Sequence, residues 1–194
     1  TALPGLHDRD GQRLYLTAAE RAAFLAAAQQ FPRELRTFCT LLHDTGCRVS
    51  EALAVTPERI DFSGKAVTFE TLKKRKRGVF RAVPVPDATL DLLDMVHAIR
   101  EKKRKRQKTD RLWPWHRVTA WRQVVEVMIA AKITDGPHKC PKGLRHGYGV
   151  HAINKAVPLN MLSKWMGHSS LEITAIYANA LGEEQRNIAA RMWT

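Results

Sequence analysis

Two arginines, Arg48 and Arg145, stand at positions where a helix is expected to begin. Arg48 follows the helix-stopping Gly46, close to free backbone N–H groups that can bind an anion. Arg145 lies in "PKGLRHGYG", where Pro141 suits the first helical position and Lys142 shares a face with Arg145. Cations at the positive end of a helix macrodipole are unfavourable unless something negative is bound. The pattern therefore predicts an anion site, although an arginine such as Arg48, taken alone, is more often an ordinary surface residue.

The stretch "LSKWMGHSSLEITAIYAN" adds a histidine and a tyrosine. Gly167 is expected to end one helix, and Ser169 with Glu172 to form a capping box for the next, so that His168 occupies the corner between them. Tyr177 follows at helical spacing. A single tyrosine in such a pattern is more often a core aromatic, and a histidine in such a corner is more often a turn residue.

A run of five basic residues separates two β-rich stretches, "AVTFETL" and "VFRAVPVP". We expect it to form the tip of a hairpin, where it attracts DNA electrostatically. One lysine of the run can also reach a reacting phosphate, but the spacing alone does not select which. The residues of this tip are Lys73, Lys74, Arg75, Lys76 and Arg77.

Signals for metal or nucleotide chemistry are weak. His138, Cys140 and His146 contain zinc-binding residue types, but their spacing fits no closed structural site. The sequence has no glycine-rich phosphate loop with a lysine, and it has no paired carboxylates near the basic positions, which argues against a two-metal nuclease. We therefore expect neither a metal nor a cofactor.

The elements that must position these residues are mostly helical. A capping box at Thr17 and Glu20 precedes an alanine-rich helix, a second helix is expected over residues 33–46, and a third runs from Cys47 to Thr56-Pro57. Helices are further expected over residues 87–99 and 118–133, and in short pieces broken at positions 158, 167 and 182. Residues 100–111 have no apolar face and are predicted to be a solvated loop or frayed end. The fold class predicted is mainly α with a small antiparallel β-sheet (α+β), in one domain over residues 1–194.

The composition favours a polyanionic partner. The 194 residues include 32 Lys plus Arg against 19 Asp plus Glu, a formal net charge of +13, which points to nucleic acid first and to an anionic membrane second. Three cysteines form no paired framework and favour a reducing compartment. There is no signal peptide and no apolar run long enough to span a bilayer. Because the chain starts at Thr1 rather than Met, we expect an excised or processed domain.

Four motifs together resemble the catalytic domain of the tyrosine recombinases, the phage integrase family. They are "TGCRVSEAL", the basic hairpin "ETLKKRKRG…RAVPVP", "GLRHGYG" and "WMGHSSLEITAIY", and they occur in the order typical of that family. The resemblance covers residues 17–194, and the spacings from Arg145 to His168 and from His168 to Tyr177 are also typical of it. One such motif would be weak, but four in order are specific.

The resemblance implies a role for each matching residue. It makes Arg48 and Arg145 the arginines that clamp the scissile phosphate, Tyr177 the nucleophile and His168 a hydrogen-bonding group. The general acid is the hairpin lysine, Lys73, with Lys74 as the rival. The basic run itself predicts that Lys74, Arg75, Lys76 and Arg77 bind DNA. Lys142 stands where the family most often has histidine, which removes one possible proton acceptor for the tyrosine and adds a cation that can lower its pKa.

The resemblance also implies the reaction and its setting. It implies site-specific recombination or integration of a mobile genetic element, through a 3′-phosphotyrosyl intermediate and without metal. The partners implied are double-stranded DNA and, in the synapse, three further copies in a homotetramer, with a monomer or weak oligomer when free and no membrane. The segment over residues 182–193 would contact a neighbouring protomer, an N-terminal DNA-clamp domain would lie outside this chain, and the location would be cytoplasmic, at the prokaryotic nucleoid. The alternatives are a type IB topoisomerase-like enzyme, an inactive DNA-binding protein derived from an integrase and, less favoured, a basic RNA-binding module.

Overall fold

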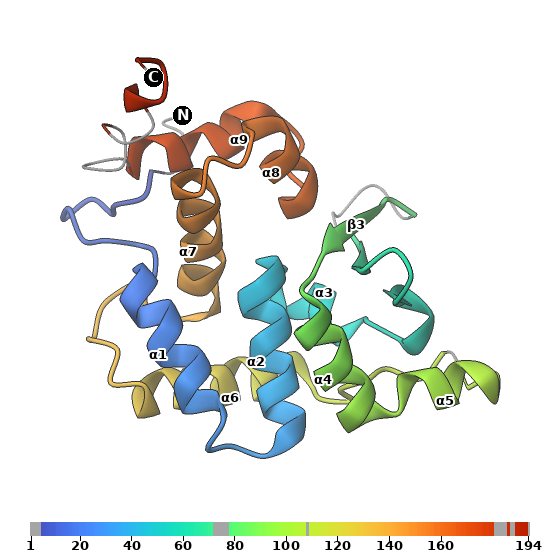
Figure 1. The fold of residues 1–194 in the computed structure, drawn as a ribbon. Coiled ribbons are helices and arrows are strands. Elements are labelled where there is room, and N and C mark those ends of the chain that lie inside the picture. The colour runs from blue at the N-terminus through green and yellow to red at the C-terminus, as the bar shows by residue number, and fades with distance from the viewer. Residues whose placement is uncertain (1–4, 72–77, 108, 181–185, 187–188, 194) are drawn as a thin grey trace.

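Helices dominate the structure, a computed structural model that describes residues 5–71, 78–107, 109–180, 186 and 189–193 (Figure 1). The α-helices are α1 (Ala18–Ala28), α2 (Arg33–Thr45), α3 (Val49–Leu53), α4 (Asp87–His97), α5 (Ile99–Arg104), α6 (Arg117–Ala130), α7 (Pro141–Asn154), α8 (Leu159–Met166) and α9 (Leu171–Ala175). The strands are β1 (Ile60–Asp61), β2 (Ala66–Glu70) and β3 (Phe80–Pro84), and the 3₁₀ helices are η1 (Pro57–Arg59) and η2 (Ile176–Ala180). None of the helices in the described ranges combines the length and the apolar character that crossing a bilayer requires.

The ends of the first two helices follow the predicted capping pattern. The backbone N–H of Glu20 donates to Thr17 Oγ1 at 3.2 Å, and the Glu20 carboxylate accepts from the Thr17 N–H at 3.0 Å, which completes the capping box of α1. Helix α2 ends at Gly46, which is left-handed (φ 62°) and donates its N–H to the Leu42 carbonyl at 3.0 Å. The chain therefore turns sharply just before Arg48.

The strands form the small antiparallel sheet that was predicted, and their order in it is β1-β2-β3. Val67 is the register partner of both Ile60 on β1 and Val83 on β3, and all three side chains are fully buried. Strand β3 alternates exposed and buried positions, so one face of the sheet packs on the core. The predicted basic hairpin tip, residues 73–77, lies outside the described residues.

The prediction of a solvated loop or frayed end over residues 100–111 is wrong for the first part of this stretch, because Ile99–Arg104 form helix α5. Ile99 is fully buried and anchors the start of the helix. The Arg100 guanidinium lies 3.9 Å from the centroid of the Phe62 ring, and Lys103 Nζ donates to the carbonyl of Ile60. The helix therefore lies against the sheet through its basic side chains, which an apolar-periodicity argument does not detect.

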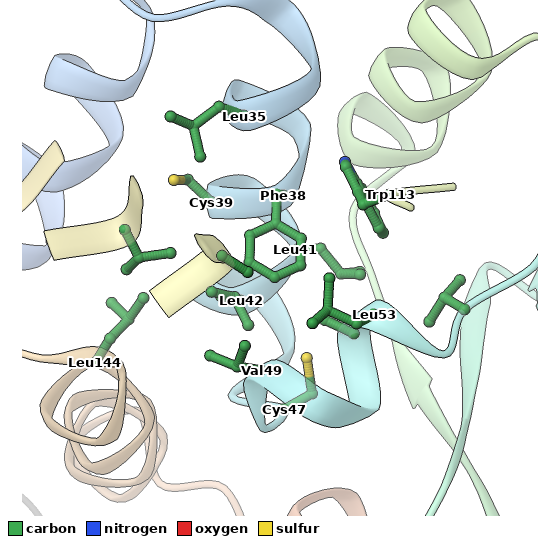
Figure 2. Close-up of a cluster of buried hydrophobic side chains, with 14 of the residues drawn as sticks. Leu35, Phe38, Cys39, Leu41, Leu42, Cys47, Val49, Leu53, Trp113 and Leu144 are labelled. Carbon is green, nitrogen blue, oxygen red and sulfur yellow. The ribbon is translucent and has the colours of Figure 1, made fainter. Parts of the chain in front are cut away.

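Helix α7 connects two hydrophobic clusters. Leu144, near its start, is 1% exposed and packs with α2 side chains such as Phe38 and Leu42; Figure 2 shows this cluster, with Leu144 pointing into it from α7. Val150 and Ile153, further along, belong to a second cluster with residues of α8 and η2. The helix is thus fixed at both ends, and in Figure 1 it runs from the layer of α1, α2 and α6 to that of α8 and α9.

A buried ion pair joins α3 to β3. The Glu51 carboxylate is 1% exposed and accepts from Arg81 Nη1 at 2.6 Å and Nη2 at 3.0 Å. Arg81 also donates from Nε to the Trp165 carbonyl on α8 at 2.7 Å and from Nη1 to Thr71 Oγ1 at 3.0 Å. One guanidinium therefore links three elements that are far apart in the sequence.

Replacing Glu51 with Ala should lower the free energy of unfolding by about 3–5 kcal/mol, because it leaves the buried Arg81 charge without its partner. The measurement is urea denaturation followed by circular dichroism. As a control, Glu101→Ala removes an exposed pair with Lys105 and should cost under about 1 kcal/mol. A Glu51→Ala variant as stable as the control would show that the pair does not hold these elements together.

Candidate active site

Five of the residues predicted from the motifs line one cavity of about 440 Å³. They come from segments far apart in the chain: the start of α3, the first turns of α7, the corner between α8 and α9, and η2. These residues are Arg48, Lys142, Arg145, His168 and Tyr177. The fold thus brings together a set of cations, an imidazole and a phenol, which suits the binding of an anion next to a nucleophile.

Arg145 is held by the ends of two other helices. Its Nη1 donates to the carbonyl of Gly46 at 2.6 Å and its Nη2 to the carbonyl of Met166 at 2.7 Å, at the C-termini of α2 and α8. The negative ends of two helix dipoles therefore compensate the cation that the start of α7 disfavours. Burial, with Arg48 adding to it, lowers the pKa of Arg145 to about 10, so the guanidinium stays charged near neutrality. Its remaining N–H donors are available to an anion in the cavity.

Arg48 is positioned by its backbone rather than by its side chain. Its N–H donates to Glu51 Oε1 at 2.9 Å, which fixes the start of α3, while the Arg48 side chain is 44% exposed. The guanidinium approaches the same carboxylate oxygen at 3.5 Å, a long contact because that oxygen is already shared with Arg81. The Arg48 side chain is thus directed to the cavity and stays free to move toward a ligand.

Tyr177 is almost completely buried, at 1% exposure, and its ring packs against the backbone of α7. A Cβ added at Gly149 would lie 2.6 Å from the Tyr177 ring, so glycine makes this approach possible. Burial raises the pKa of the Tyr177 hydroxyl to about 12, although Arg145 and Arg48 act to lower it. Lys142 is not among the groups that lower this pKa in the DNA-free protein, so its expected effect on Tyr177 stays a prediction.

His168 occupies the predicted corner, but the cap differs from the prediction. The N-cap of α9 is Ser170 and has no side-chain cap hydrogen bond, so the expected capping box of Ser169 and Glu172 does not form. Instead His168 Nδ1 lies 2.7 Å from Thr174 Oγ1, and the imidazole stacks on the Tyr177 ring at 6.3 Å between centroids and 14° between planes.

The corner itself depends on Gly167, which ends α8 in a left-handed conformation (φ 67°). A Cβ there would lie 2.9 Å from Arg81 Nη1. Both the conformation and the close approach of the guanidinium therefore require glycine.

Of the remaining predicted residues, the structure describes Lys142 but not the basic run over residues 73–77. Lys142 lies on the exposed rim of the cavity, on the same side of α7 as Arg145, as its spacing predicts. Lys73, the expected general acid, and its neighbours Lys74, Arg75, Lys76 and Arg77 lie outside the described residues.

The cavity lining also includes three residues with cationic or aromatic side chains that were not predicted to belong to the site: His146, Arg117 and Trp121. His146 Nδ1 lies 3.0 Å from the Tyr177 hydroxyl, yet the sequence suggested it only as a weak zinc ligand. Its supposed co-ligand His138 is instead 3.3 Å from the Glu20 carboxylate. Arg117 and Trp121 are four residues apart on α6, and this helical spacing of a cation and an aromatic was the available signal.

Replacing Gly149 with Ala should destabilise the protein by about 1–3 kcal/mol through overpacking against Tyr177, despite the higher helix propensity of alanine. Urea denaturation of wild type and variant measures the change in the free energy of unfolding.

The double variant Gly149→Ala/Tyr177→Ala is the matched control. Once the ring is absent, the added methyl group has room, so the cost of Gly149→Ala should largely disappear in the Tyr177→Ala background. A Gly149→Ala protein as stable as wild type would contradict the close packing of Tyr177 on α7.

Comparison with known proteins agrees with this geometry. Residues 14–184 match the model of the "Phage integrase family". Tyrosine recombinase XerA of Pyrococcus furiosus is 28% identical over 165 residues, covering 80% of this chain and 54% of the relative, so the chain spans about half the length of such curated relatives. The solved structure of XerH recombinase bound to its difH substrate superposes with a TM-score of 0.73 at 19% identity, over 97% of this chain and 60% of that one. The catalytic domain of bacteriophage HP1 integrase superposes with a TM-score of 0.64 at 23% identity, over 87% of this chain and 88% of that one. By the extent of the family match and by its fold, the chain belongs to the phage integrase family.

Proposed function

We propose that this chain is the catalytic domain of a site-specific DNA recombinase or integrase that cleaves and rejoins strands through a 3′-phosphotyrosyl intermediate on Tyr177. The observation that carries the proposal is the convergence of Arg48, Arg145, His168 and Tyr177 on one cavity. A phosphodiester is anionic, and its cleavage needs positive charge where charge develops in the transition state. The cavity supplies that charge from arginines.

Each group has a role that its geometry supports. Arg145, rigidly held by two carbonyls, and Arg48, free on one side, clamp the two non-bridging oxygens of the scissile phosphate. His168 hydrogen-bonds a phosphate oxygen next to the Tyr177 ring on which it stacks. The Tyr177 oxygen attacks phosphorus while the bond to the 5′ oxygen breaks.

The leaving 5′ oxygen must gain a proton. We propose that Lys73 supplies it, with Lys74 as the alternative donor, because a lysine at a hairpin tip can reach the leaving group. The neighbouring Arg75, Lys76 and Arg77 contact DNA phosphates. The 5′ hydroxyl of a second strand then attacks the phosphotyrosine, so bond energy is conserved and no nucleotide cofactor is consumed.

Double-stranded DNA is the proposed partner, in keeping with the net charge of +13 and with relatives solved in complexes with DNA. Strand exchange between two sites would take four copies of the protein. The segment over residues 182–193 would pack on a neighbouring copy, since Met192 and Trp193 are 75% and 77% exposed in the single chain. We place the assembly in the cytoplasm, at the DNA of a prokaryotic host.

The topoisomerase and the inactive DNA-binding protein are less well supported than the recombinase. A topoisomerase-like enzyme would use the same tyrosine and arginines, but the relatives that match most of this chain are named recombinases. An inactive DNA-binding descendant would be free to lose active-site residues, whereas here the two arginines, the histidine and the tyrosine still line one cavity.

Wild-type protein should form a covalent adduct with nicked duplex DNA, and Tyr177→Phe should reduce it to background because the nucleophilic oxygen is absent. A library of nicked duplexes with a randomised core serves as the probe. Adducts are recovered on denaturing gels, and their sensitivity to protease shows that the DNA is linked to protein.

Tyr148→Phe is the matched control, since it removes a hydroxyl from a neighbouring tyrosine that does not line the cavity. It should leave the adduct yield unchanged. An adduct that persists in Tyr177→Phe would disprove the assignment of the nucleophile, and a wild-type protein that forms none with any duplex would favour the inactive binder.

Lys142→His should keep the rate of adduct formation within about tenfold of wild type, whereas Lys142→Ala should lower it by about 10–100-fold, as expected for one lost electrostatic contact to the phosphate. Quenched time courses on a recovered DNA site measure both rates. Lys155→Ala, an exposed lysine at the other end of α7, is the control and should not change the rate. Equal rates for Lys142→Ala and wild type would remove Lys142 from the site.

A further inference from the structure

His146 makes a direct contact with the proposed reacting oxygen. Its Nδ1 lies 3.0 Å from the Tyr177 hydroxyl, and the two rings are tilted by 54° with centroids 5.9 Å apart. The imidazole follows Arg145 on α7 and lines the same cavity. The histidine is therefore placed within the 2.6–3.2 Å reach that proton transfer requires.

In this hydrogen bond the Tyr177 hydroxyl donates and His146 Nδ1 accepts. A buried hydroxyl group requires a partner, and among the described residues His146 is the hydrogen-bond partner found for Tyr177. A neutral imidazole with its proton on Nε2 accepts at Nδ1, so the phenol can donate to it. His168 Nδ1 is committed to Thr174, and its ring lies parallel to that of Tyr177.

The surroundings keep His146 in the form that can accept a proton. Burial lowers its pKa to about 4, and the charges of Lys142 and Arg145 contribute in the same direction. The other charged or titratable groups around the cavity are Arg48 and Cys47 on the α3 side, Arg117 from α6 and His168 from the α8–α9 corner. The Cys47 thiol stays neutral, because burial raises its pKa to about 12. At neutral pH the imidazole is therefore uncharged and has a free lone pair.

We propose that His146 is the proton acceptor for Tyr177, the part that falls vacant because position 142 is lysine. The inference rests on the proposed cleavage reaction and deepens it. As the bond from Tyr177 Oη to phosphorus forms and the bond to the 5′ oxygen breaks, the Oη proton moves to His146 Nδ1. During rejoining, a 5′ hydroxyl attacks phosphorus, the Oη–phosphorus bond breaks, and Nδ1 returns the proton to Oη. His146 is unchanged over the full cycle.

Bound DNA makes His146 a stronger base than it is in the free protein. The scissile phosphate would lie against Arg145 and Lys142, the two cations that act on the imidazole. A negative charge there offsets theirs and favours the protonated ring, so the pKa of His146 rises when DNA binds. The proton acceptor therefore becomes effective when the substrate is in place.

The first test needs neither DNA nor a variant of His146. Nitrogen-15 NMR of the free protein at pH 7 should show His146 neutral, with Nε2 protonated and Nδ1 unprotonated but hydrogen-bonded. Tyr177→Phe should shift the Nδ1 resonance, because the donor is lost. Protonation on Nδ1 would overturn the proposal, and this result stands whether or not the protein cleaves DNA.

The second test compares adduct formation by wild type and His146→Asn as a function of pH, on a DNA site recovered from the randomised library. Asparagine keeps a hydrogen-bonding atom near Nδ1 but cannot hold the proton. The variant should react about 10²-fold more slowly at pH 7. Its rate should rise with pH, because the phenol must then ionise unaided. The wild-type rate should be flat at neutral pH and fall only as His146 becomes protonated at lower pH.

His151→Asn is the matched control, a histidine on the same helix that does not line the cavity, and it should behave as wild type. A His146→Asn rate within threefold of wild type, or a slower rate with an unchanged pH profile, would overturn proton acceptance by His146. A wild-type protein that forms no adduct would instead contradict the proposed function. If His146→Asn does not fold, as judged by thermal melting, the NMR result decides alone.

Discussion

The buried ion pair between Glu51 and Arg81 holds the two halves of the candidate site in register. Glu51 fixes the start of α3, where Arg48 begins, by accepting its backbone N–H. Arg81 reaches the carbonyl of Trp165 and packs against Gly167, which places the corner that carries His168. Both charges are desolvated, and the other cation near the pair, Arg48, approaches Glu51 only at 3.5 Å, so the geometry of the Glu51–Arg81 pair allows little variation. The distance between the first arginine and the histidine corner is therefore set by a pair that does not itself line the cavity.

Arg145 is a second buried guanidinium that joins distant elements, and it connects α7 to α2 and α8. Its guanidinium is bonded to the carbonyls that end α2 and α8, so two helix C-termini orient a side chain that starts from the N-terminal part of a third helix. The sequence predicts the cation in this arrangement but not the carbonyls that bind it. From "PKGLRHGYG" one sees a cation in an unfavourable position, whereas the compensating carbonyls lie far away in the chain and become visible only in three dimensions. The local conflict noted in the sequence is thus resolved partly by the protein and, on the proposed function, partly by DNA.

The features that depend on neighbouring residues in the sequence were predicted correctly. The capping box at Thr17, the end of α2 at Gly46 and the alternation in β3 depend on neighbours in the sequence, and all three are present. The motif residues could be selected from the sequence because their types and order are specific to a family. The wrong predictions concern segments that are held by tertiary contacts. Helix α5 is anchored through Ile99 and through cations on Phe62. At the start of α9 the expected capping box does not form, and His168 instead lies within hydrogen-bond distance of Thr174. His146 was missed as a partner of Tyr177, since nothing in the spacing of the two residues reveals a hydrogen bond between helices.

The electrostatics of the cavity couple its reactivity to its ligand. Burial holds the Tyr177 hydroxyl in its neutral form, with a pKa of about 12, while Arg48, Lys142 and Arg145 concentrate positive charge beside it. A neutral phenol is a poor nucleophile until a base takes its proton, so the reaction needs a proton acceptor as well as the cations. A phosphodiester bound between the arginines has two effects. It neutralises Lys142 and Arg145, whose charges act together with burial to lower the pKa of His146, and it presents the phosphorus to which the phenol oxygen can bond. Proton transfer and bond formation then favour each other, which confines the proposed chemistry to the moment when DNA occupies the site.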